Sequence, residues 1–230
     1  MTNIISVHGL TYEYEKDIRI LDNINFYLSE NDNLALIGAN GVGKSTFLQL
    51  ILGLLEPKSG EIFYKGSKIT KKSLPDIRKN IGFIFQNPDV QLFCNTIFDD
   101  IAFGPLNAGL PAAEVQARAE EVLKALNISH LKERTPFKLS AGEKRLSAIA
   151  TVLSMQPKVL LMDEPSAELD PKARRNLIAL INSLPQAKII ATHDLDLAKK
   201  TCKRALVLHN GKADMLDEIP DENSLIEYGL

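Results

Sequence analysis

The sequence lacks most features of a secreted or membrane-spanning protein. Its two cysteines, Cys94 and Cys202, stand alone without a CxxC pair or a metal-ligand spacing, which favours a reducing compartment over a disulfide framework. The longest apolar stretches, such as residues 159–162, are far shorter than the roughly 20 residues that cross a bilayer. Residues 1–6 have neither the basic nor the apolar segment of a signal peptide. If the protein works at a membrane, we expect a partner to hold it there.

The chain also lacks any long run of basic residues. Its 27 Lys and Arg side chains are balanced by 29 Asp and Glu, for a net charge of −2. Basic residues adjoin only in short pairs such as Lys71-Lys72 and Arg174-Arg175. Because binding to a phosphate backbone needs a concentrated positive surface, we expect no nucleic-acid partner. The 45% hydrophobic content of 230 residues suits one substantial core with a smaller lobe attached.

Strand-like and helix-like segments alternate along most of the chain, which predicts an α/β fold with a mainly parallel sheet. Two early segments, residues 4–10 and 23–28, are expected to form an antiparallel β flap. Asn210-Gly211 predicts a hairpin between residues 205–208 and 212–216. The expected strands of the sheet are residues 34–37, 81–85, 159–162, 188–191 and 205–208. The expected helices between them are residues 44–52, 142–154, 172–184 and 194–200.

The strand signal vanishes between residues 87 and 139. Pro111 precedes apolar residues at helical spacing, from Val115 to Leu126, and further prolines punctuate the surroundings. This pattern predicts an inserted α-helical subdomain. We therefore expect a single domain over residues 1–230, with a catalytic core formed by residues 1–86 and 145–230 and a helical lobe formed by residues 87–144. The acidic tail, residues 214–230, is expected to be a surface helix or a frayed end.

A glycine-rich segment joins the apolar run at residues 34–37 to a helical segment. Residues 38–46 have the sequence GANGVGKST, which matches the pattern GxxxxGK[ST]. Glycine lets the backbone turn tightly and approach an anion closely. In a strand-turn-helix context the pattern predicts a P-loop, with Lys44 on the terminal phosphates of a nucleotide and Ser45 on Mg²⁺. The residues expected to bind the nucleotide here are Gly38, Asn40, Gly41, Val42, Gly43, Lys44, Ser45 and Thr46.

A second chemical signal is the buried-strand pattern at residues 159–162, which ends in Asp163 and Glu164. Such a strand places Asp163 beside the P-loop, where its carboxylate can hold Mg²⁺. Glu164 is expected near the γ-phosphate, where a carboxylate can orient and deprotonate the attacking water. An isolated acidic pair is often only solvated surface, but the P-loop in the same chain favours the catalytic interpretation.

With these motifs together, nearly the whole chain resembles an ATP-binding cassette (ABC) transporter ATPase, with a P-loop NTPase core. Residues 139–143, LSAGE, lie where that family has its LSGGQ signature, so the resemblance implies that Ser140, Ala141, Gly142 and Glu143 contact the ATP held by a second ABC ATPase subunit. The partner can be identical or related. Ala141 and Glu143 depart from the family pattern. If residue 141 needs a positive φ, alanine costs about 1 kcal/mol, and we expect a working but weaker trans site.

The resemblance also assigns roles to single residues. Gln86 matches the Q-loop glutamine, which contacts Mg²⁺ and the lytic water, and Asp170 matches the aspartate of the D-loop. His193 follows the expected strand 188–191 and matches the switch histidine at the γ-phosphate. Tyr14 is expected to stack on the adenine of ATP, with Tyr12 as the alternative. The implied catalytic residues are Glu164, His193 and Gln86, and the implied Mg²⁺ ligands are Ser45, Gln86 and Asp163.

The segment after Gln86 indicates which kind of ABC ATPase the chain resembles. Its order NPDVQLF at residues 87–93, followed by residues 96–106, is similar to ATPases of energy-coupling-factor (ECF) importers, the cobalt-transport ATPases included. That similarity implies a transmembrane coupling protein, a substrate-binding membrane protein and a peripheral position on the cytoplasmic face of the membrane. The cargo would be a micronutrient such as cobalt, nickel or biotin. The alternatives are a conventional ABC importer or exporter subunit, a soluble ABC ATPase and an ATP-sensing interaction module.

Overall fold

Two β-sheets frame the molecule, which is described by a computed structural model covering residues 3–15 and 18–229. The larger sheet has the strand order β10-β9-β3-β8-β7-β6. Strands β3 to β9 of this sheet are parallel, and β10 joins the edge in the antiparallel direction. The prediction of an α/β fold with a mainly parallel sheet is therefore confirmed. The strands are β3 (Asn33–Ile37), β6 (Ile81–Ile84), β7 (Val159–Asp163), β8 (Ala187–Ala191), β9 (Arg204–His209) and β10 (Lys212–Leu216).

The parallel strands are apolar throughout because both of their faces are buried. On β3, Leu34 and Leu36 pack into the core layer beneath the antiparallel sheet, whereas Ala35 and Ile37 pack into the layer on the opposite face. Residues 159–162 of β7 alternate in the same way. Period-two alternation between two apolar layers produces the continuous hydrophobic runs seen in the sequence.

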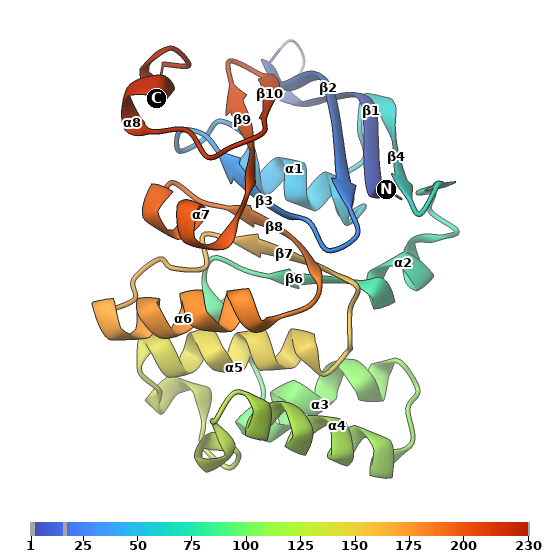
Figure 1. Cartoon of the computed structure of the whole chain (residues 1–230). Coiled ribbons are helices and arrows are strands. Elements are labelled where there is room, and N and C mark those ends of the chain that lie inside the picture. The colour runs from blue at the N-terminus through green and yellow to red at the C-terminus, as the bar shows by residue number, and fades with distance from the viewer. Residues whose placement is uncertain (1–2, 16–17, 230) are drawn as a thin grey trace.

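Helices cover both faces of the parallel sheet (Figure 1). α1 (Lys44–Ile51) lies between the two sheets, and α5 (Ala141–Leu153), α6 (Pro171–Ser183) and α7 (Leu195–Thr201) cover the other face. All four helices were predicted, with ends that differ by at most one residue. None of the helices within residues 3–15 and 18–229 is long and apolar enough to cross a membrane.

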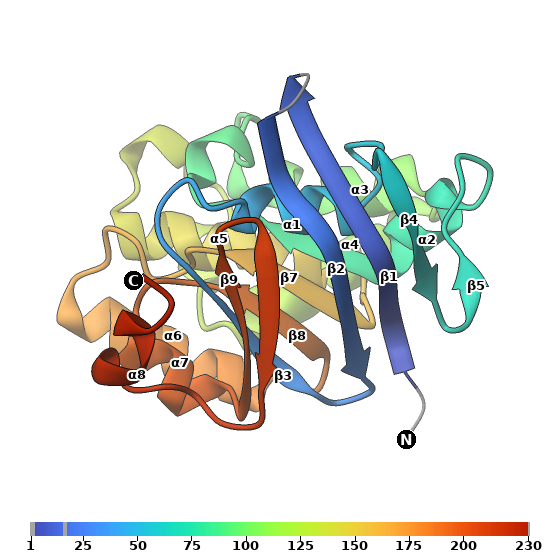
Figure 2. The ribbon, with the colours of Figure 1, turned by 90° about the horizontal axis from the view of Figure 1, so that it is seen from above.

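The smaller sheet is antiparallel, with the order β2-β1-β4-β5, and Figure 2 views it from above with β9 and β10 beside β2. Its strands are β1 (Asn3–Glu15), β2 (Ile18–Ser29), β4 (Ser59–Tyr64) and β5 (Ser67–Lys68). The antiparallel flap was predicted from parts of β1 and β2, but β4, β5 and α2 (Leu74–Asn80) were missed. The first three residues of β4 are exposed and polar, so the pattern carries little strand signal, and pairing with β1 holds β4 in place.

The residues between β6 and α5 form a helical layer at the bottom of Figure 1. It contains α3 (Ile97–Asn107) and α4 (Ala112–Ala125), with short 3₁₀ turns at Pro88–Val90, Ser129–Leu131 and Pro136–Lys138. α3 packs against both α4 and α5. Pro111 is the N-cap of α4, as the sequence pattern indicates. The boundary expected between residues 144 and 145 falls inside α5, and the division into a core and a helical lobe stays a prediction.

The hairpin expected at Asn210-Gly211 joins β9 to β10. Both turn residues have positive φ, 46° and 76°, as a type I′ turn requires. The carbonyl of Gly211 accepts a hydrogen bond from the backbone N–H of Asp22 on β2, at 2.7 Å, and so ties the hairpin to the smaller sheet. The expectation of a surface helix or frayed end over residues 214–230 was wrong at its start, because residues 214–216 belong to β10. A short helix, α8 (Glu222–Ile226), follows.

Candidate functional site

The predicted phosphate-binding loop lies at the carboxyl end of β3, where it leads into α1. An open pocket of about 480 Å³ forms there. Parallel strands carry their functional loops at this edge of the sheet, and the loops after β6, β7 and β8 all reach the pocket. The lining residues are Tyr14, Ile20, Asn40, Gly41, Gly43, Lys44, Ser45, Thr46, Gln86, Asp163, Glu164 and His193.

Local geometry explains the glycine at residue 43. Gly43 is the N-cap of α1 with a φ of 114°, which L-residues rarely adopt, and a Cβ there would lie 2.8 Å from Cγ2 of Ile20. Because α1 begins directly after it, the free N–H groups and the positive end of the helix dipole face the pocket. The arrangement suits an anion such as a nucleotide phosphate.

Lys44 is the buried cation of this pocket. Its side chain is only 7% exposed, and its Nζ donates to the carbonyl oxygens of Gly38 and Ala39 at 2.8 and 3.3 Å. It also lies 3.5 Å from Oε1 of Glu164. Two predicted residues, Gly38 and Val42, do not line the pocket. The backbone carbonyl of Gly38 still contributes, because it accepts a hydrogen bond from the Lys44 side chain.

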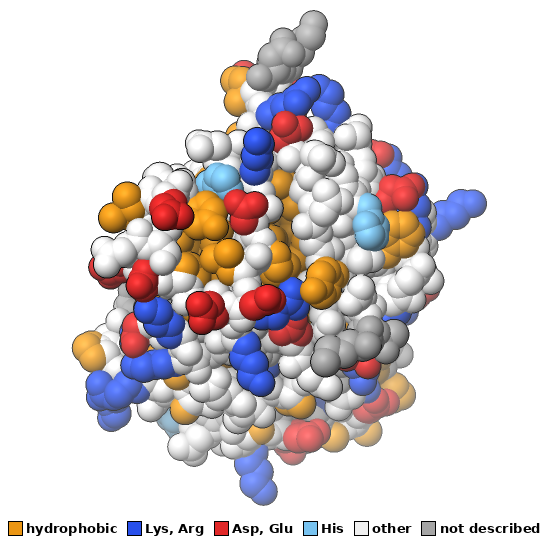
Figure 3. All heavy atoms as spheres, turned by 45° about the horizontal axis from the view of Figure 1, so that its top comes forward, with side chains coloured by type: hydrophobic (Ala, Val, Ile, Leu, Met, Phe, Trp, Pro, Cys, Tyr) orange, Lys and Arg blue, Asp and Glu red, His pale blue; other side chains and the backbone are white. Residues whose placement is uncertain are grey.

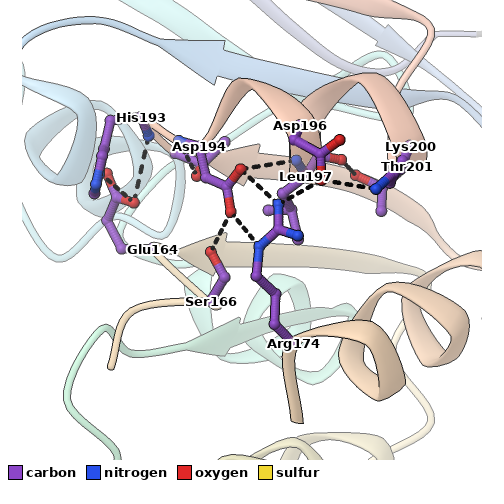
Figure 4. Close-up of polar contacts among 10 residues, drawn as sticks. Glu164, Ser166, Arg174, His193, Asp194, Asp196, Leu197, Lys200 and Thr201 are labelled. Atoms are coloured by element: carbon purple, nitrogen blue, oxygen red, sulfur yellow. Dashed lines mark hydrogen bonds and ion pairs between the residues drawn. The ribbon is translucent and has the colours of Figure 1, made fainter. Parts of the chain in front are cut away.

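Glu164 connects the loop after β7 to the loop after β8. Its Oε2 lies 3.0 Å from Nδ1 of His193, and the backbone N–H of His193 donates to the same oxygen at 3.4 Å (Figure 4). Glu164 has a φ of 43°, which is strained for a residue with a side chain. The Glu164 side chain is 7% exposed and that of His193 is 66% exposed. A buried carboxylate therefore lies between a lysine ammonium and an imidazole, as a general base at a phosphate site would.

Asp163 is a buried carboxylate that lines the same pocket. It is buried at the end of β7, and its Oδ1 has no hydrogen-bond partner among the described residues. Burial raises the pKa of Asp163 and the Glu164 carboxylate adds to this, although a hydrogen bond with Ser45 lowers it. An unpaired buried carboxylate oxygen beside a hydroxyl is a hard-oxygen donor set. The residues present therefore fit Mg²⁺, with Gln86 on the same pocket wall.

The two tyrosines of β1 differ in exposure. Tyr14 is 58% exposed and its hydroxyl lies 2.9 Å from Oγ1 of Thr46, whereas Tyr12 is buried, 9% exposed, in the core of the smaller sheet. The rings meet edge to face at 5.0 Å. Only Tyr14 presents a free ring face at the pocket, so the geometry favours Tyr14 over Tyr12 for stacking on a base.

Substitutions at Tyr14 separate stacking from hydrogen bonding. We expect Tyr14→Phe to bind ATP within about twofold of wild type, because it keeps the ring. Tyr14→Ala should weaken binding about tenfold, since stacking of a base on an aromatic ring contributes on the order of 1–3 kcal/mol. Titration calorimetry with MgATP and MgGTP provides the measurement. Equal affinity of Tyr14→Ala and wild type would remove Tyr14 from the base-binding role.

The predicted signature loop and Asp170 lie outside the pocket. Ser140 is the N-cap of α5 in a capping box with Glu143: the Glu143 Oε2 accepts from the Ser140 backbone N–H at 2.8 Å and from its hydroxyl at 2.7 Å. Those hydrogen bonds lower the pKa of Glu143. Asp170 is the N-cap of α6 and accepts from the N–H groups of Lys172 and Ala173. Neither Ser140 nor Asp170 lines the pocket, so the pocket of one chain does not by itself bring them to a nucleotide.

The expectation of a weaker trans site assumed a positive φ at residue 141. Ala141 is the first residue of α5, and its φ is not positive, so alanine is unstrained there. We expect Ala141→Gly to leave the ATPase rate equal or slightly higher, within about twofold, because glycine at a helix end costs little. Steady-state phosphate release measures this. A collapse of activity would show that the methyl group itself is needed.

Sequence reasoning missed the side chains that fix the loop containing Gln86. Arg145 of α5 is 2% exposed, and its guanidinium donates to the carbonyl oxygens of Phe85 and Gln86, both at 2.7 Å. Gln91 accepts from the Phe85 N–H and donates to the Ala148 carbonyl. A charged residue two positions past the capping box looks like a solvated surface residue, so the sequence carries no signal for this burial.

The fold and the pocket together define a P-loop nucleotide-binding protein. The profile of the family described as ABC transporter matches residues 21–167. A putative ABC transporter ATP-binding protein of Geobacter sulfurreducens is 43% identical over 91% of this chain and 84% of its own. An energy-coupling factor transporter ATP-binding protein, EcfA, of Methanoculleus marisnigri is 42% identical over 91% of this chain and 77% of its own.

A solved structure agrees with these relatives. The structure of cbiO1 from Clostridium perfringens, described as part of the ABC transporter complex cbiONQ, superposes with a TM-score of 0.85 at 37% identity. It covers 94% of this chain and 89% of its own. This chain therefore belongs to the ABC transporter family, as an ATP-binding and ATP-hydrolysing subunit. The resemblance to ABC ATPases of the energy-coupling-factor type is confirmed.

Proposed function

We propose that this chain powers the import of a micronutrient through an energy-coupling-factor type transporter. Its partners would be a second ABC ATPase subunit, identical or related, a transmembrane coupling protein and a substrate-binding membrane protein. The chain would lie peripherally on the cytoplasmic face of the membrane. The cargo class is a transition-metal ion such as cobalt or nickel, or a vitamin such as biotin. The description of the EcfA relative as an energy-coupling factor transporter protein supports the type of transporter, and the description of cbiO1 as part of a transporter complex supports the presence of partner proteins.

The observation that carries the proposal is an exposed apolar surface on the lobe, next to the loop containing Gln86. Phe93 and Phe103 are 60% and 46% exposed, and their rings pack edge to face at 4.9 Å. Val90 and Leu106 are more than half exposed, and Phe85 is 37% exposed. Leu106 follows Phe103 by one helical turn on α3, and exposed apolar surface of this kind often marks a binding site. We assign this surface, Phe85, Val90, Phe93, Phe103 and Leu106, to the membrane coupling protein.

The same surface lies close in the chain to the nucleotide pocket. Gln86 lines the pocket and directly follows Phe85, and Arg145 holds the backbone carbonyls of both residues. A change in the position of Gln86 is therefore passed through a short, hydrogen-bonded segment to the partner surface. This connection supports a role in coupling ATP hydrolysis to a movement of the lobe.

The pocket residues divide the chemistry among them. The N–H groups at the start of α1 and the Lys44 ammonium would bind the phosphates, and Ser45, Asp163 and Gln86 would hold Mg²⁺. The bound cation would neutralise phosphate charge. Glu164 would take a proton from the attacking water, and His193, on its other side, would contact the γ-phosphate. Tyr14 would stack on the adenine.

Closure of two subunits would complete the site. Ser140, Ala141, Gly142 and Glu143 at the exposed start of α5, with Asp170 at the start of α6, would contact the ATP and the surface of the other subunit. The exposed ring of Phe137, 81% accessible, lies just before this loop and supports a protein contact there. Because ATP would touch both faces only in the closed state, it would stabilise that state alone.

The second candidate is the ATPase subunit of a conventional ABC importer or exporter. It shares the nucleotide pocket and differs in the membrane protein that the lobe contacts. An ATP-sensing module that binds without turnover ranks lower, because Glu164 and His193 are both present and lie 3.0 Å apart. A soluble ABC ATPase would share these residues and ranks lower because the relatives are named as transporter proteins.

The identity of the membrane partner decides between these functions. We would express a tagged Glu164→Gln variant in its native membrane background, extract it gently with ATP present, and identify the co-purifying proteins. The matched control is the same variant carrying Phe103→Asp, which places a charge in the apolar surface. A coupling protein together with a small substrate-binding membrane protein, both lost from the control, supports the proposal. A conventional permease pair, or no membrane protein, overturns it.

A further inference from the structure

A network of charged side chains lies behind His193, outside the pocket (Figure 4). Arg174 of α6 makes a two-pronged ion pair with Asp194, its Nε and Nη2 each lying 2.7 Å from one carboxylate oxygen. The Arg174 Nη2 also donates to Asp196 at 2.8 Å. A guanidinium held by two carboxylates in this planar geometry is a strong and directional contact.

Asp194 joins this network to the catalytic loop because it directly follows His193. Its carboxylate caps α7 by accepting from the Leu197 N–H at 2.9 Å, and its own N–H donates to the Thr192 hydroxyl at 3.0 Å. The backbone is thus fixed on both sides of His193. Burial alone would raise the pKa of Asp194, but the hydrogen bonds from Arg174 and the Leu197 N–H lower it overall.

The network also reaches the loop after β7. The Ser166 hydroxyl donates to Oδ2 of Asp194 at 3.3 Å, and Ser166 lies two residues after Glu164. Arg174 itself lies one turn into α6, whose N-cap is Asp170. The loops that carry Glu164, Asp170 and His193 therefore meet at one ion pair, and neither Arg174 nor Asp194 is among the described residues that line the pocket.

We propose that Arg174 is a positioning residue for ATP hydrolysis, which holds Asp194 and thereby sets the position of His193 against Glu164. The His193 side chain is 66% exposed, and within the described residues the polar partner of its ring is Glu164. Because few neighbouring side chains pack against the imidazole, its orientation depends on the position of the His193 backbone. A displacement of about 1 Å at a reacting group can reduce a rate on the order of a hundredfold.

Arg175 provides a matched control for Arg174. Arg175 is the next residue of α6 and is exposed, so Arg175→Gln removes the same charge from the same helix without touching Asp194. Arg174→Lys keeps the charge but cannot make the two-pronged contact, because an ammonium is a single point charge. Arg174→Gln removes both the charge and the geometry.

The experiment compares ATP turnover, ATP affinity and the state of the His193 ring in these variants. We expect Arg174→Gln to lower kcat at least about tenfold with KM for ATP within about twofold, and Arg174→Lys to restore part of the loss. Arg175→Gln should match wild type. The imidazole NMR signal of His193, assigned by its absence in His193→Ala, should shift in Arg174→Gln and not in Arg175→Gln.

Two results would overturn the proposal: equal kcat for Arg174→Gln and Arg175→Gln, or a loss that follows the melting temperature while the His193 signal stays in place. The role of Arg174 rests on the proposed role of His193, and a separate variant tests His193 itself. Wild-type turnover by His193→Ala would remove His193 from the mechanism, whatever Arg174 does.

Discussion

Glu164→Gln should bind MgATP at least as tightly as wild type and hydrolyse it at least about a hundredfold more slowly, because an amide cannot accept the proton of the attacking water. The substitution keeps the shape of the side chain, which is 7% exposed between Lys44 and His193. It also removes the negative charge that lies 3.5 Å from the Lys44 ammonium, so that ammonium becomes freer to pair with phosphate. Bound ATP should then persist and hold two subunits together.

Gel filtration and phosphate release measure the two parts of this expectation. With MgATP the variant should elute as a dimer, and without nucleotide as a monomer, since the ligand shifts the equilibrium only by its preference for the closed state. Glu56→Gln is the control, because Glu56 is exposed and, within residues 3–15 and 18–229, its one ion pair is with Lys71 at 3.0 Å. Wild-type turnover by Glu164→Gln would remove Glu164 from the role of general base.

Arg145→Ala should lower the free energy of unfolding by about 3 kcal/mol, since it breaks two hydrogen bonds to a charged donor at about 1.5–3 kcal/mol each, partly offset by relief of a buried charge. The guanidinium is 2% exposed, and its burial lowers the pKa of Arg145. The same change frees the carbonyls of Phe85 and Gln86. We therefore expect the ATPase rate to fall together with the stability.

Lys144→Ala is the matched control for this experiment. Lys144 is the preceding residue of α5 and pairs with Asp89 at 2.6 Å, with its side chain 19% exposed. A partly exposed ion pair contributes less than about 1 kcal/mol. Urea denaturation followed by circular dichroism gives both values. Equal midpoints for the two variants would mean that Arg145 does not hold the loop after β6.

Some parts of the site follow from the sequence because their signals are local. The spacing of Gly38, Gly41 and Gly43 before Lys44 requires a tight turn ahead of a helix, and α1 begins at Lys44 as expected. The apolar runs of β3 and β7 predict strands buried on both faces, and Asp163 ends β7. Each of these inferences uses residues within one turn or one strand of each other.

Other parts required contacts that the sequence does not display. Ser59–Tyr64 becomes β4 because β1 is long enough to pair with it. Tyr14, rather than Tyr12, presents its ring to the pocket because the end of β1 extends past the core that buries Tyr12. Propensity and hydrophobic pattern carry no information on such pairings, since the partners lie far apart in the chain.

The sequence by itself determined the class of the protein, its nucleotide pocket and its two central carboxylates, because glycine turns, apolar periodicity and acidic strand ends are readable over a few residues. Only the tertiary structure decided which charged side chains hold the loops around the pocket in place. Arg145 reaches Gln86 across 59 residues, and Arg174 reaches Asp194 across 20. Such side chains look like solvated surface in a sequence, and only the folded chain shows that burial and a fixed partner make them structural.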